Sequence, residues 1–555
     1  MADKGLRAID LYSGVGGWSL GLRLAGIEVV ASYERWGAAN ETNFKNNKHP
    51  AQTVDIRGLS VGELPKDIDI VVGSPPCTQF SFSNRGGNGD LDDGLKDIVK
   101  FLEIVDAIRP SAWAMENVPR VASIIEEELK EGHRLHRFRH LGVKCHVINM
   151  ADYGLPQRRK RCVAGNFDPK LLAAYAKGQK RRTLGHVLSA LREETIRDPL
   201  YGATLPRADL KDHHPEPALN EEEVRVNRAA KVFHPVYNAM SFPDSPDRPV
   251  RTITATCTRV SRESIVVGPA GDCDEFRRLT IRERACLQGF PVWFQFYASS
   301  YGQKLKMVGN AIPPYFAYFV GAALRGLQPD ELPSIENACA GLYGPQPDPP
   351  STTPECAGTH YPKSRTFRFA IPSLRLKSGV RFELANAAAG EVMWQVAFVF
   401  GTSKSIHRLA LDESVLARML KRLPPHVADE LLEELSILDD FIAEADVPNM
   451  QTIWSHRGPG RTRPFMLLDE LDAVGLTAQR LLSPQEPLCR ILVAEEAAHQ
   501  HADALEKVAG LNKLANNATV IAAGLIVGSL ANVALARHSA AAATLELKER
   551  SRPRR

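Results

Sequence analysis

Asp10-Leu11-Tyr12-Ser13-Gly14-Val15-Gly16-Gly17 lies between a short apolar run and a helical one. Residues 6–11 have the composition of a buried strand, and residues 18–24 have apolar positions at helical spacing. Glycines in such a turn let the backbone approach a ligand closely, and the N-terminus of the following helix favours a negative group. The spacing is not Gly-x-Gly-x-x-Gly, which argues against a dinucleotide. The stretch predicts a strand–turn–helix unit that binds a nucleotide-like ligand.

Strand-like and helical stretches alternate from this unit to about residue 165. Further strands are expected at 27–33, 68–72 and 112–115, and a helix is expected at 95–108. Such alternation is typical of a doubly wound, mostly parallel sheet. The fold class we predict is therefore α/β and Rossmann-like, with an irregular insert and a separate C-terminal α+β or helical domain.

Changes in composition divide the chain into segments. The alternation ends near residue 167, and the following residues are rich in Pro, His, Arg and Asp with few long apolar runs, as in exposed loops. Helical patterning returns near Arg278, and a stretch dense in Pro, Gly, Ser and Thr then predicts a linker. We predict a first part of the sheet domain at 1–167, an irregular region at 168–275, a closing part at 276–327, a linker at 328–363, a second domain at 364–510, and an apolar helix with a basic tail at 511–555.

The composition is that of a soluble globular protein, with 44% hydrophobic and 24% charged residues. A net charge of +4 neither requires nor excludes a polyanionic partner. The nine cysteines include no Cys-x-x-Cys pair, which argues against a zinc cluster or a disulfide framework and suits a reducing compartment. The first residues lack the apolar core of a secretory signal, so we expect a cytoplasmic protein.

A cysteine stands in the loop after the predicted strand at 68–72. The loop is Gly73-Ser74-Pro75-Pro76-Cys77-Thr78-Gln79, at the carboxyl edge of the sheet, where open α/β sheets hold their active sites. Cysteines are more often buried packing residues. Here two prolines fix the backbone before a thiol in a polar loop, which favours a nucleophile.

Charged residues follow other predicted strands. Glu34 ends the second strand, where an acid can bind both hydroxyls of a ribose, and Asp55 follows a third extended stretch, although each alone is more often a solvated loop residue. Glu116 can hold a proton toward a ring nitrogen, or else cap a helix. Arg159 and Arg161 alternate ahead of a strand and so point to one side, where they can hold a base carbonyl and a phosphate. A basic run of this kind is otherwise usually a solvated patch.

The chain resembles the DNA cytosine-C5 methyltransferases from about Arg7 to Ala323, with its motifs in the order of that family. The resemblance extends from the glycine turn to a closing motif near residue 310. It is carried by Asp10–Gly17, Glu34, Asp55-Ile56, Pro76-Cys77, Glu116-Asn117-Val118, Gln157-x-Arg159-x-Arg161, residues 278–291, and Gly309-Asn310-Ala311-Ile312-Pro313-Pro314.

This resemblance implies a site for S-adenosylmethionine (SAM) and no metal. Tyr12 stands where the family usually has Phe, and Arg35 stands where it often has an aromatic residue, so the nearest aromatic candidate is Trp36. The residues that the resemblance places around the cofactor are Asp10, Tyr12, Ser13, Gly14, Gly16, Gly17, Glu34, Trp36, Asp55, Ile56, Pro75, Asn310 and Ala311.

The resemblance also implies a mechanism. The thiolate of Cys77 adds to C6 of cytosine, which makes C5 able to attack a methyl group. Glu116 is expected at N3 and Arg159 at O2, with Arg161 supporting it. The cytosine must leave the duplex, and residues 168–275 are expected to recognise the target sequence. Further DNA contacts are expected at Gln79, Ser81, Gln157, Arg251, Thr252 and Thr254.

Two other functions stay open at this stage. The first is C5 methylation of RNA such as tRNA, which the long irregular region disfavours. The second is a non-catalytic DNA-binding regulator, against which the intact Cys77, Glu116, Arg159 and Arg161 argue. The expected partner is duplex DNA, and a cognate restriction endonuclease would be a separate protein. Neither the recognition sequence nor the oligomeric state can be read from the residues.

Residues 514–536 form an uncharged run between Lys513 and Arg537. Its length suits a membrane span, and Gly524 and Gly528 have small-x-x-x-small spacing. Three asparagines and a high alanine content favour a buried or oligomerising helix instead, and a basic tail follows. No pattern assigns a function to residues 364–510, so a structural or interaction module is expected there.

Overall fold

The computed structural model describes residues 5–77, 79–80, 90–210, 214–232, 240–269, 275–342, 346–356, 367–376, 380–386, 394–402, 405–445, 447, 450, 464–500, 514 and 516–550. The chain divides into two compact units. Unit 1 comprises Met1–Leu219 and Ser241–Glu355, and unit 2 comprises Asn220–Met240 and Cys356–Arg555. Unit 2 therefore includes a segment from the middle of the region predicted as an irregular insert.

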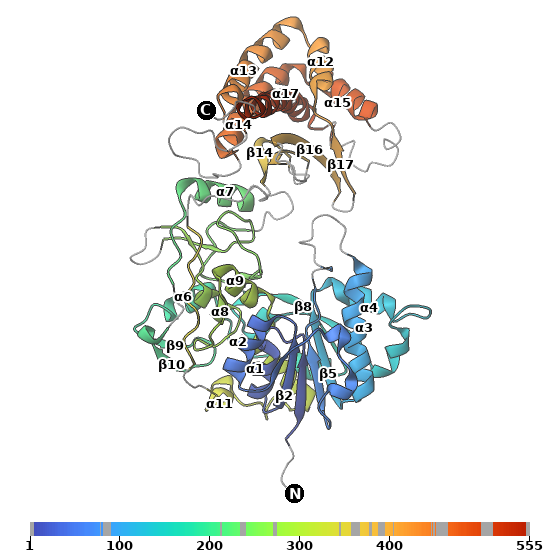
Figure 1. Ribbon diagram of the computed structural model, residues 1–555, viewed down its shortest axis with the longest axis vertical. Helices are drawn as coiled ribbons and strands as arrows, with labels where there is room; N and C mark the ends of the chain where they lie inside the picture. Colours follow the sequence, from blue (N-terminus) through green and yellow to red (C-terminus); the bar gives the residue numbers. More distant parts are fainter. Residues whose placement is uncertain are drawn as a thin grey trace. The chain divides into compact units, whose positions relative to one another are not determined.

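Unit 1 is built on a seven-stranded sheet in the order β3-β2-β1-β4-β5-β8-β6 (Figure 1). The first five strands in this order are parallel, and β8 is antiparallel to both β5 and β6. This confirms the predicted doubly wound, mostly parallel α/β fold. The strands are β1 Arg7–Leu11, β2 Glu28–Glu34, β3 Ala51–Thr53, β4 Ile70–Gly73, β5 Ala112–Asn117, β6 Lys144–Asn149 and β8 Lys160–Gly165.

Helices cover both faces of this sheet, so its central strands are apolar on both sides. Ala8 and Ile9 are neighbours in β1, yet they belong to two different cores. One core contains side chains of α1 and α10, and the other contains side chains of α3 and α4. The helices that frame the sheet are α1 Gly17–Leu24, α2 Gly37–Asn47, α3 Leu91–Ile108, α4 Arg120–Glu128 and α10 Pro314–Arg325.

The remainder of unit 1 consists of short elements, as the Pro-rich composition predicts. A short strand, β11, pairs in parallel with β7 and so joins the irregular region to the segment that carries Arg159. The elements are β7 Gln157–Arg158, α5 Pro169–Tyr175, α6 Leu184–Ala190, β9 Thr195–Arg197, β10 Thr204–Pro206, β11 Val250–Arg251, β12 Val266–Val267, β13 Arg277–Arg278, α8 Ile281–Leu287, α9 Tyr301–Asn310 and α11 Ile335–Cys339.

Unit 2 combines a four-stranded antiparallel sheet, in the order β14-β15-β16-β17, with a set of helices. Helix α7 joins this unit through an ion pair between Arg225 and Asp469 of α14 (2.7 Å). The elements are α7 Glu221–Val232, β14 Arg368–Arg375, β15 Arg381–Asn386, β16 Trp394–Thr402, β17 Ser405–Leu409, α12 Glu413–Arg422, α13 Pro425–Glu444, α14 Pro464–Leu482, α15 Glu486–Gln500 and α17 Ala518–Arg550.

The uncharged run near the C-terminus forms α17, which packs in the core of unit 2. Its segment Ala518–His538 is long and apolar enough to cross a membrane, but 72% of its most apolar window is buried within the protein. A Cβ on Gly524 would lie 2.2 Å from the ring of Phe382, and one on Gly528 would lie 2.8 Å from Leu411. The two glycines therefore let α17 lie directly on the sheet of unit 2.

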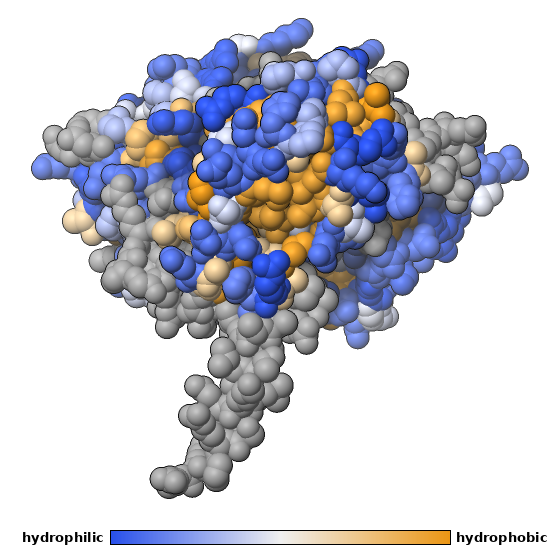
Figure 2. Space-filling model, turned by 90° about the horizontal axis from the view of Figure 1, so that it is seen from above, coloured by the Kyte–Doolittle hydropathy of each residue, from blue (hydrophilic) through white to orange (hydrophobic). Residues whose placement is uncertain are grey.

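Apolar side chains also reach the surface of unit 2. Figure 2 looks onto the protein from the side of α12 and α13 and shows an apolar area bordered by polar residues. The helices of unit 2 carry four large aliphatic side chains that are 45–58% exposed: Leu432, Ile437, Leu476 and Ile491.

The close packing of α1 on α10 generates a stability prediction. A Cβ on Gly21 would lie 2.4 Å from Ala317 Cβ and 2.7 Å from its backbone carbon, so Gly21→Ala should destabilise unit 1 by about 1–3 kcal/mol. Gly302→Ala is the matched control, because no atom lies within 4 Å of the new methyl group and alanine favours a helix. Urea unfolding followed by circular dichroism measures both. Equal stability of wild type and Gly21→Ala would contradict the packing.

Candidate active site

The glycine turn and the cysteine loop lie side by side at the carboxyl edge of the sheet. They follow β1 and β4, adjacent parallel strands at the point where the strand order reverses. The Ser74 N–H donates to the carbonyl of Leu11 (3.2 Å), and the Trp18 indole N–H donates to the Ser74 hydroxyl (3.0 Å). These bonds hold the loop that carries Cys77 against the turn that begins α1. Sequence reasoning assigned no role to Ser74, which lies inside the cysteine loop, or to Trp18, which directly follows the glycine turn.

Backbone geometry explains the glycines of the turn. Gly14 and Gly16 have φ angles of 52° and 85°, which other residues rarely adopt. A Cβ on Gly16 would lie 2.1 Å from Asn43 Oδ1, and one on Gly17 would lie 2.1 Å from the carbonyl oxygen of Ile312. A Cβ on Gly14 would meet nothing within 4 Å. Gly16 and Gly17 therefore allow close packing, whereas Gly14 borders open space that a ligand can occupy.

Two buried oxygen atoms at this turn, Asp10 Oδ1 and Ser13 Oγ, have no hydrogen-bond partner within the part of the chain that the structure describes. The other Asp10 oxygen accepts from the N–H (3.1 Å) and the hydroxyl (2.7 Å) of Ser19. Burial raises the pKa of Asp10 to about 7, although these two bonds act to lower it. Glu34 accepts from the N–H of Gly14 (3.2 Å). The turn therefore offers oxygen atoms suited to the amino and hydroxyl groups of a cofactor.

An aromatic ring stands beside Glu34. The N–H of Trp36 donates to Glu34 (2.9 Å), and the half-buried ring of Trp36 has Lys306 Nζ 5.1 Å from its centroid. Lys306 lies on α9, whose last residue is the exposed Asn310. Ala311 follows and is nearly buried. The end of α9 and the ring of Trp36 thus belong to the same side of the site.

The side chains of Tyr12, Asp55 and Ile56 are engaged with the protein. The Tyr12 hydroxyl donates to Asp97 (3.2 Å), and burial together with Asp97 raises the pKa of Tyr12. Asp55 is exposed and accepts from the N–H of Arg57 (3.0 Å), while Arg57 also binds Asp97 (2.7 Å). Ile56 is 2% exposed and packs in the core. These residues fix the segment after β3 against α3 and thereby shape the edge of the site.

Four predicted catalytic residues are brought together next to the cysteine loop. Arg161 Nε pairs with Glu116 Oε1 at 3.0 Å, and both side chains are largely buried. Burial raises the pKa of the Cys77 thiol, and the carboxylate of Glu116 adds to this effect. Arg161 and Arg159 act in the opposite direction. The thiol therefore lies within electrostatic reach of one carboxylate and two guanidinium groups.

Arg159 is 1% exposed and binds backbone carbonyls from two distant segments. It donates to Ile253 (3.3 Å), Gly309 (3.2 Å) and Ala311 (3.0 Å). Its Nε has no partner among the described residues. Burial and, to a smaller extent, the neighbouring charge of Arg161 lower the pKa of Arg159 to about 9. The two terminal nitrogens of this guanidinium group thus bind the loop at 250–254 and the end of α9. The Nε atom is the donor that can bind a ligand.

Two residues predicted to contact DNA bind other side chains of the protein. Gln157 is fully buried, donating to Gln288 (2.7 Å) and accepting from the N–H of Ile253 (2.9 Å). Arg251 pairs with Asp244 (2.9 Å). Both side chains support the loop at 250–254. Gln157 is enclosed by partners far away in sequence, whereas Arg251 is partly exposed and its partner Asp244 is near in sequence. Gln288, which the sequence analysis included in a motif without a role, completes this support.

The other expected DNA contacts lie at or near the surface. Thr252 donates to the carbonyl of Arg158 (3.0 Å), and Thr254 donates to that of Thr256 (2.8 Å). Gln79 accepts from the N–H of Asp90 (3.0 Å). Ser81 lies outside the described residues.

Asn117 and Pro75 connect the two loops beside the thiol. Asn117 donates to the carbonyl of Pro75 (3.0 Å) and so braces the cysteine loop against the end of β5. The predicted cofactor contact of Pro75 thus sits on a loop whose backbone is fixed from both sides. The sequence analysis identified Asn117 as part of a motif but assigned it no role.

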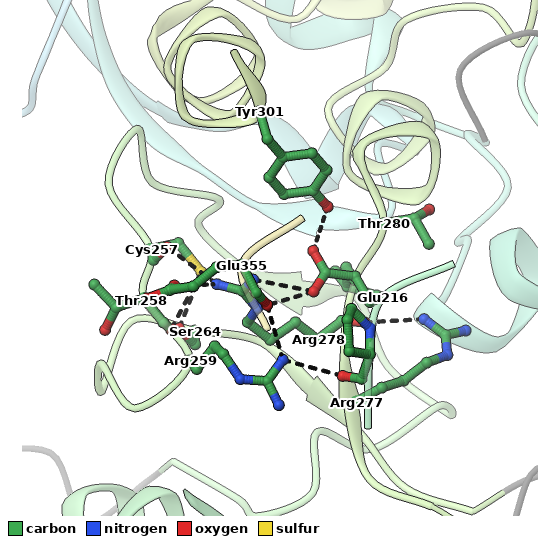
Figure 3. A network of polar contacts seen from close by, with 12 residues as sticks. Glu216, Cys257, Thr258, Arg259, Ser264, Arg277, Arg278, Thr280, Tyr301 and Glu355 are labelled. Carbon is green, nitrogen blue, oxygen red and sulfur yellow. Dashed lines mark hydrogen bonds and ion pairs between the residues drawn. The ribbon is translucent and has the colours of Figure 1, made fainter. Parts of the chain in front are cut away.

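A buried polar network lies behind the 250–264 loop, and the sequence analysis gave it no role (Figure 3). Arg278 pairs with Glu216 (3.0 Å) and with Glu355 (3.5 Å), and the Tyr301 hydroxyl donates to Glu216. Arg259 is also buried and donates to the carbonyls of Pro217 (3.1 Å) and Glu355 (3.2 Å). The chain passes from unit 1 into unit 2 after Leu219 and again after Glu355. Arg259 thus binds the backbone next to both of these positions.

Cys257 lies at the other end of this network. Its sulfur accepts from Arg284 (3.0 Å) and lies 2.9 Å from the Ser264 hydroxyl. Burial acts to raise the pKa of Cys257, but Arg284 and Arg278 outweigh it and the pKa is lowered. This thiol is a packed acceptor for buried guanidinium groups, in contrast to Cys77.

Known proteins match somewhat more than half of this chain. The model of the family described as C-5 cytosine-specific DNA methylase matches residues 6–325. The chain is 29% identical over 357 residues to the Type II methyltransferase M1.HphI of Haemophilus parahaemolyticus, covering 59% of this chain and 88% of that protein. It is also 29% identical over 332 residues to M.HgiDI of Herpetosiphon aurantiacus, covering 58% and 94%. A solved structure described as a putative prophage-encoded DNA modification methyltransferase from E. coli has a TM-score of 0.44 at 22% identity, covering 58% and 99%.

The raised pKa of Asp10 generates a prediction about pH. Because the folded-state pKa of about 7 lies above the ordinary value of 3.8, the stability contribution of Asp10 is lost as pH rises from about 4 to 7. Asp10→Asn cannot titrate and keeps an acceptor for Ser19. Between pH 5 and pH 8 the free energy of unfolding should therefore fall more for wild type than for the variant, by at most about 3 kcal/mol. Urea unfolding without cofactor measures this, and parallel pH profiles would refute it.

Proposed function

Because the chain belongs to the C-5 cytosine-specific DNA methylase family, and is thus a DNA cytosine methyltransferase, we propose that unit 1 moves a methyl group from SAM to cytosine C5 in a specific duplex sequence, through a covalent bond between Cys77 and C6. The observation that supports this most is the grouping of Cys77 with Glu116, Arg159 and Arg161, next to a glycine turn that borders open space.

The residues at the glycine turn fit SAM. The partnerless oxygens of Asp10 and Ser13 can receive its amino group, and the space before Gly14 leaves room for its amino-acid portion. Glu34 can accept from the ribose hydroxyls, and the ring of Trp36 can lie against the adenine. When bound, SAM supplies a methyl group made electrophilic by its sulfonium.

The cysteine converts cytosine into a nucleophile. After Cys77 loses its proton, Sγ bonds to C6 and the ring electrons shift toward C5 and N3, where Glu116 supplies or shares a proton. Arg161 fixes the Glu116 carboxyl group, and both arginines stabilise the thiolate. Once C5 carries the methyl group, a base removes the C5 proton and the Sγ–C6 bond breaks. This step restores the thiolate and the aromatic ring.

A cytosine inside a duplex cannot present C6 to a sulfur atom, so the target must be flipped out. The loop at 250–254 can contact the DNA strand from which the cytosine has been flipped out. Its backbone is held by Gln157 and Arg159 next to the catalytic residues. Sequence recognition by the rest of 168–275, and a separate restriction endonuclease as a cellular partner, belong to the same proposal and are supported by the Type II names of the relatives.

The direct test is transfer of a labelled SAM methyl group into unmethylated duplex DNA, with tRNA as a parallel substrate. We expect label in DNA with the wild type and none with Cys77→Ala. Label in tRNA alone would place the activity on RNA. No label in either substrate would favour a DNA-binding regulator.

The covalent step can be observed separately. In DNA containing 5-fluorocytosine, C5 carries fluorine in place of hydrogen. A general base can remove a proton from C5 but cannot remove fluorine, so the Sγ–C6 bond should persist after methyl transfer. We expect a complex with DNA that resists denaturing gel electrophoresis, requires SAM and is absent in Cys77→Ser. A denaturation-resistant complex with the serine variant would contradict the assigned nucleophile.

Glu116→Gln tests the proton at N3. The amide keeps the size and an acceptor for Arg161 but cannot donate a carboxyl proton, so turnover should fall by about 10²–10⁴-fold. DNA affinity, measured by fluorescence anisotropy, should change little. A loss confined to DNA affinity would assign Glu116 a binding role instead.

A further inference from the structure

Tyr12 has an unusual backbone conformation at the start of the glycine turn. Its φ angle is 52°, which residues with large side chains rarely adopt, so this conformation persists only where surrounding contacts fix it. The next residue is Ser13, whose buried hydroxyl oxygen has no hydrogen-bond partner among the described residues, and Gly14 follows. The conformation of Tyr12 therefore determines how the turn presents these groups to a cofactor.

The hydroxyl group of Tyr12 is bound to α3. It is a donor 3.2 Å from the carboxylate and 3.3 Å from the backbone carbonyl of Asp97, whose side chain is only 8% exposed. Burial and the charge of Asp97 raise the pKa of Tyr12, so the hydroxyl keeps its proton and remains a donor near neutral pH. Asp97 thus holds the tip of the side chain whose backbone is in the left-handed region.

The same carboxylate binds Arg57. The Nε and Nη2 atoms of Arg57 donate to the two carboxylate oxygens of Asp97 at 2.9 and 2.7 Å, which is the bidentate geometry of a strong charge-assisted pair. Arg57 also donates to the carboxylate (2.8 Å) and the carbonyl (3.0 Å) of Asp93, one turn earlier in α3. Its backbone N–H donates to Asp55 (3.0 Å). Arg57 is therefore fixed at both its backbone and its side chain.

These bonds join two segments that the resemblance places around the cofactor. Tyr12 belongs to the glycine turn after β1, and Arg57 directly follows Asp55 and Ile56 after β3. The strands β1 and β3 are not neighbours, because β2 lies between them in the sheet. Asp97 belongs to neither segment, yet both bind its carboxylate. One side chain of α3 thus fixes the two segments relative to each other.

We propose that Asp97 is a positioning residue for SAM, which acts through the Tyr12 hydroxyl and the Arg57 guanidinium to hold the two segments at the separation that bound SAM requires. The inference rests on the proposed function in that SAM is taken as the cofactor. The mechanism uses none of these three side chains at the cytosine. They should therefore determine the affinity for SAM and leave the methyl-transfer step nearly unchanged.

Tyr12→Phe tests the bond to Asp97, because it keeps the ring and removes only the hydroxyl. We expect the Kd for SAM to rise about tenfold, which is the size expected for the loss of one hydrogen bond to a charged group. Isothermal titration calorimetry of the full-length protein measures this without DNA. In the methyl-transfer assay the KM for SAM should rise by a similar factor, while kcat at saturating SAM and the KM for DNA stay within about twofold of the wild type.

Tyr33→Phe is the matched control. The Tyr33 hydroxyl is buried and has no hydrogen-bond partner among the described residues, so its removal should leave the Kd for SAM unchanged. Tyr33 belongs to the core against which Tyr12 packs, so both substitutions remove one hydroxyl from the same part of unit 1. A wild-type Kd in Tyr12→Phe, or an equal rise in both variants, would overturn the proposal.

Asp97→Ala shows whether the hydroxyl acts through Asp97. If it does, Tyr12→Phe/Asp97→Ala should bind SAM about as weakly as Asp97→Ala alone, whereas the effects of independent residues would multiply. Urea unfolding of the same variants detects a purely structural role. Lower stability with a wild-type Kd for SAM would contradict the positioning role, as would multiplying effects. If Asp97→Ala does not fold, the comparison of Tyr12→Phe with Tyr33→Phe still decides.

Calorimetry separates this inference from the proposed function. Weaker SAM binding by Tyr12→Phe, together with no labelling of DNA by the wild type, would support the role of Asp97 and remove the catalytic proposal. Normal labelling by the wild type with unchanged SAM binding by Tyr12→Phe would do the reverse.

Discussion

The structure of the active site depends on one buried positive charge. A guanidinium group taken out of water is costly unless every side of it is compensated, and Arg159 is compensated mainly by three backbone carbonyls. Two of these carbonyls lie at the end of α9 and one lies in the loop at 250–254. Displacing either segment would leave the charge with fewer partners. The segment that carries Arg159, the loop at 250–254 and the end of α9 therefore keep a single arrangement. In this arrangement the thiol and the glycine turn are adjacent.

The same charge shapes the chemistry around the thiol. Burial and the Glu116 carboxylate favour a protonated Cys77, while Arg159 and Arg161 favour the thiolate. The raised pKa keeps the Cys77 thiol protonated in the free protein, and the two arginines already lie where they can stabilise a thiolate. Preorganised charges of this kind cost nothing to align at the moment of reaction. Cys257 shows the contrasting case, in which buried arginines dominate and the thiol serves packing.

The sequence predicts what depends on local pattern. Strand–helix alternation gave the doubly wound sheet, and turn chemistry placed Gly14 and Cys77 at its edge. Contacts between distant residues were beyond it. From the sequence, Gln157 is a plausible DNA contact. The structure shows that Gln288, 131 residues away, helps to enclose it. Glu216 and Glu355 meet Arg278 across 62 and 77 residues, which no periodicity encodes. By length alone the run at 514–536 suits a membrane or a core, and the sheet beneath α17 is what distinguishes the two.

Arg259 binds the chain next to both points at which it enters unit 2, and this has an evolutionary consequence. Proteins often diversify when a recognition segment is exchanged between relatives while the catalytic scaffold is kept. Here such an exchange of residues 168–275 would carry α7 away from the fold to which it belongs. The exchanged segment contains Arg259 as well as the carbonyls of Pro217 and Ala218 that it binds, so the incoming segment would also have to supply a donor for the carbonyl of Glu355. Residues 168–275 and the C-terminal unit can therefore be exchanged only together, as one block.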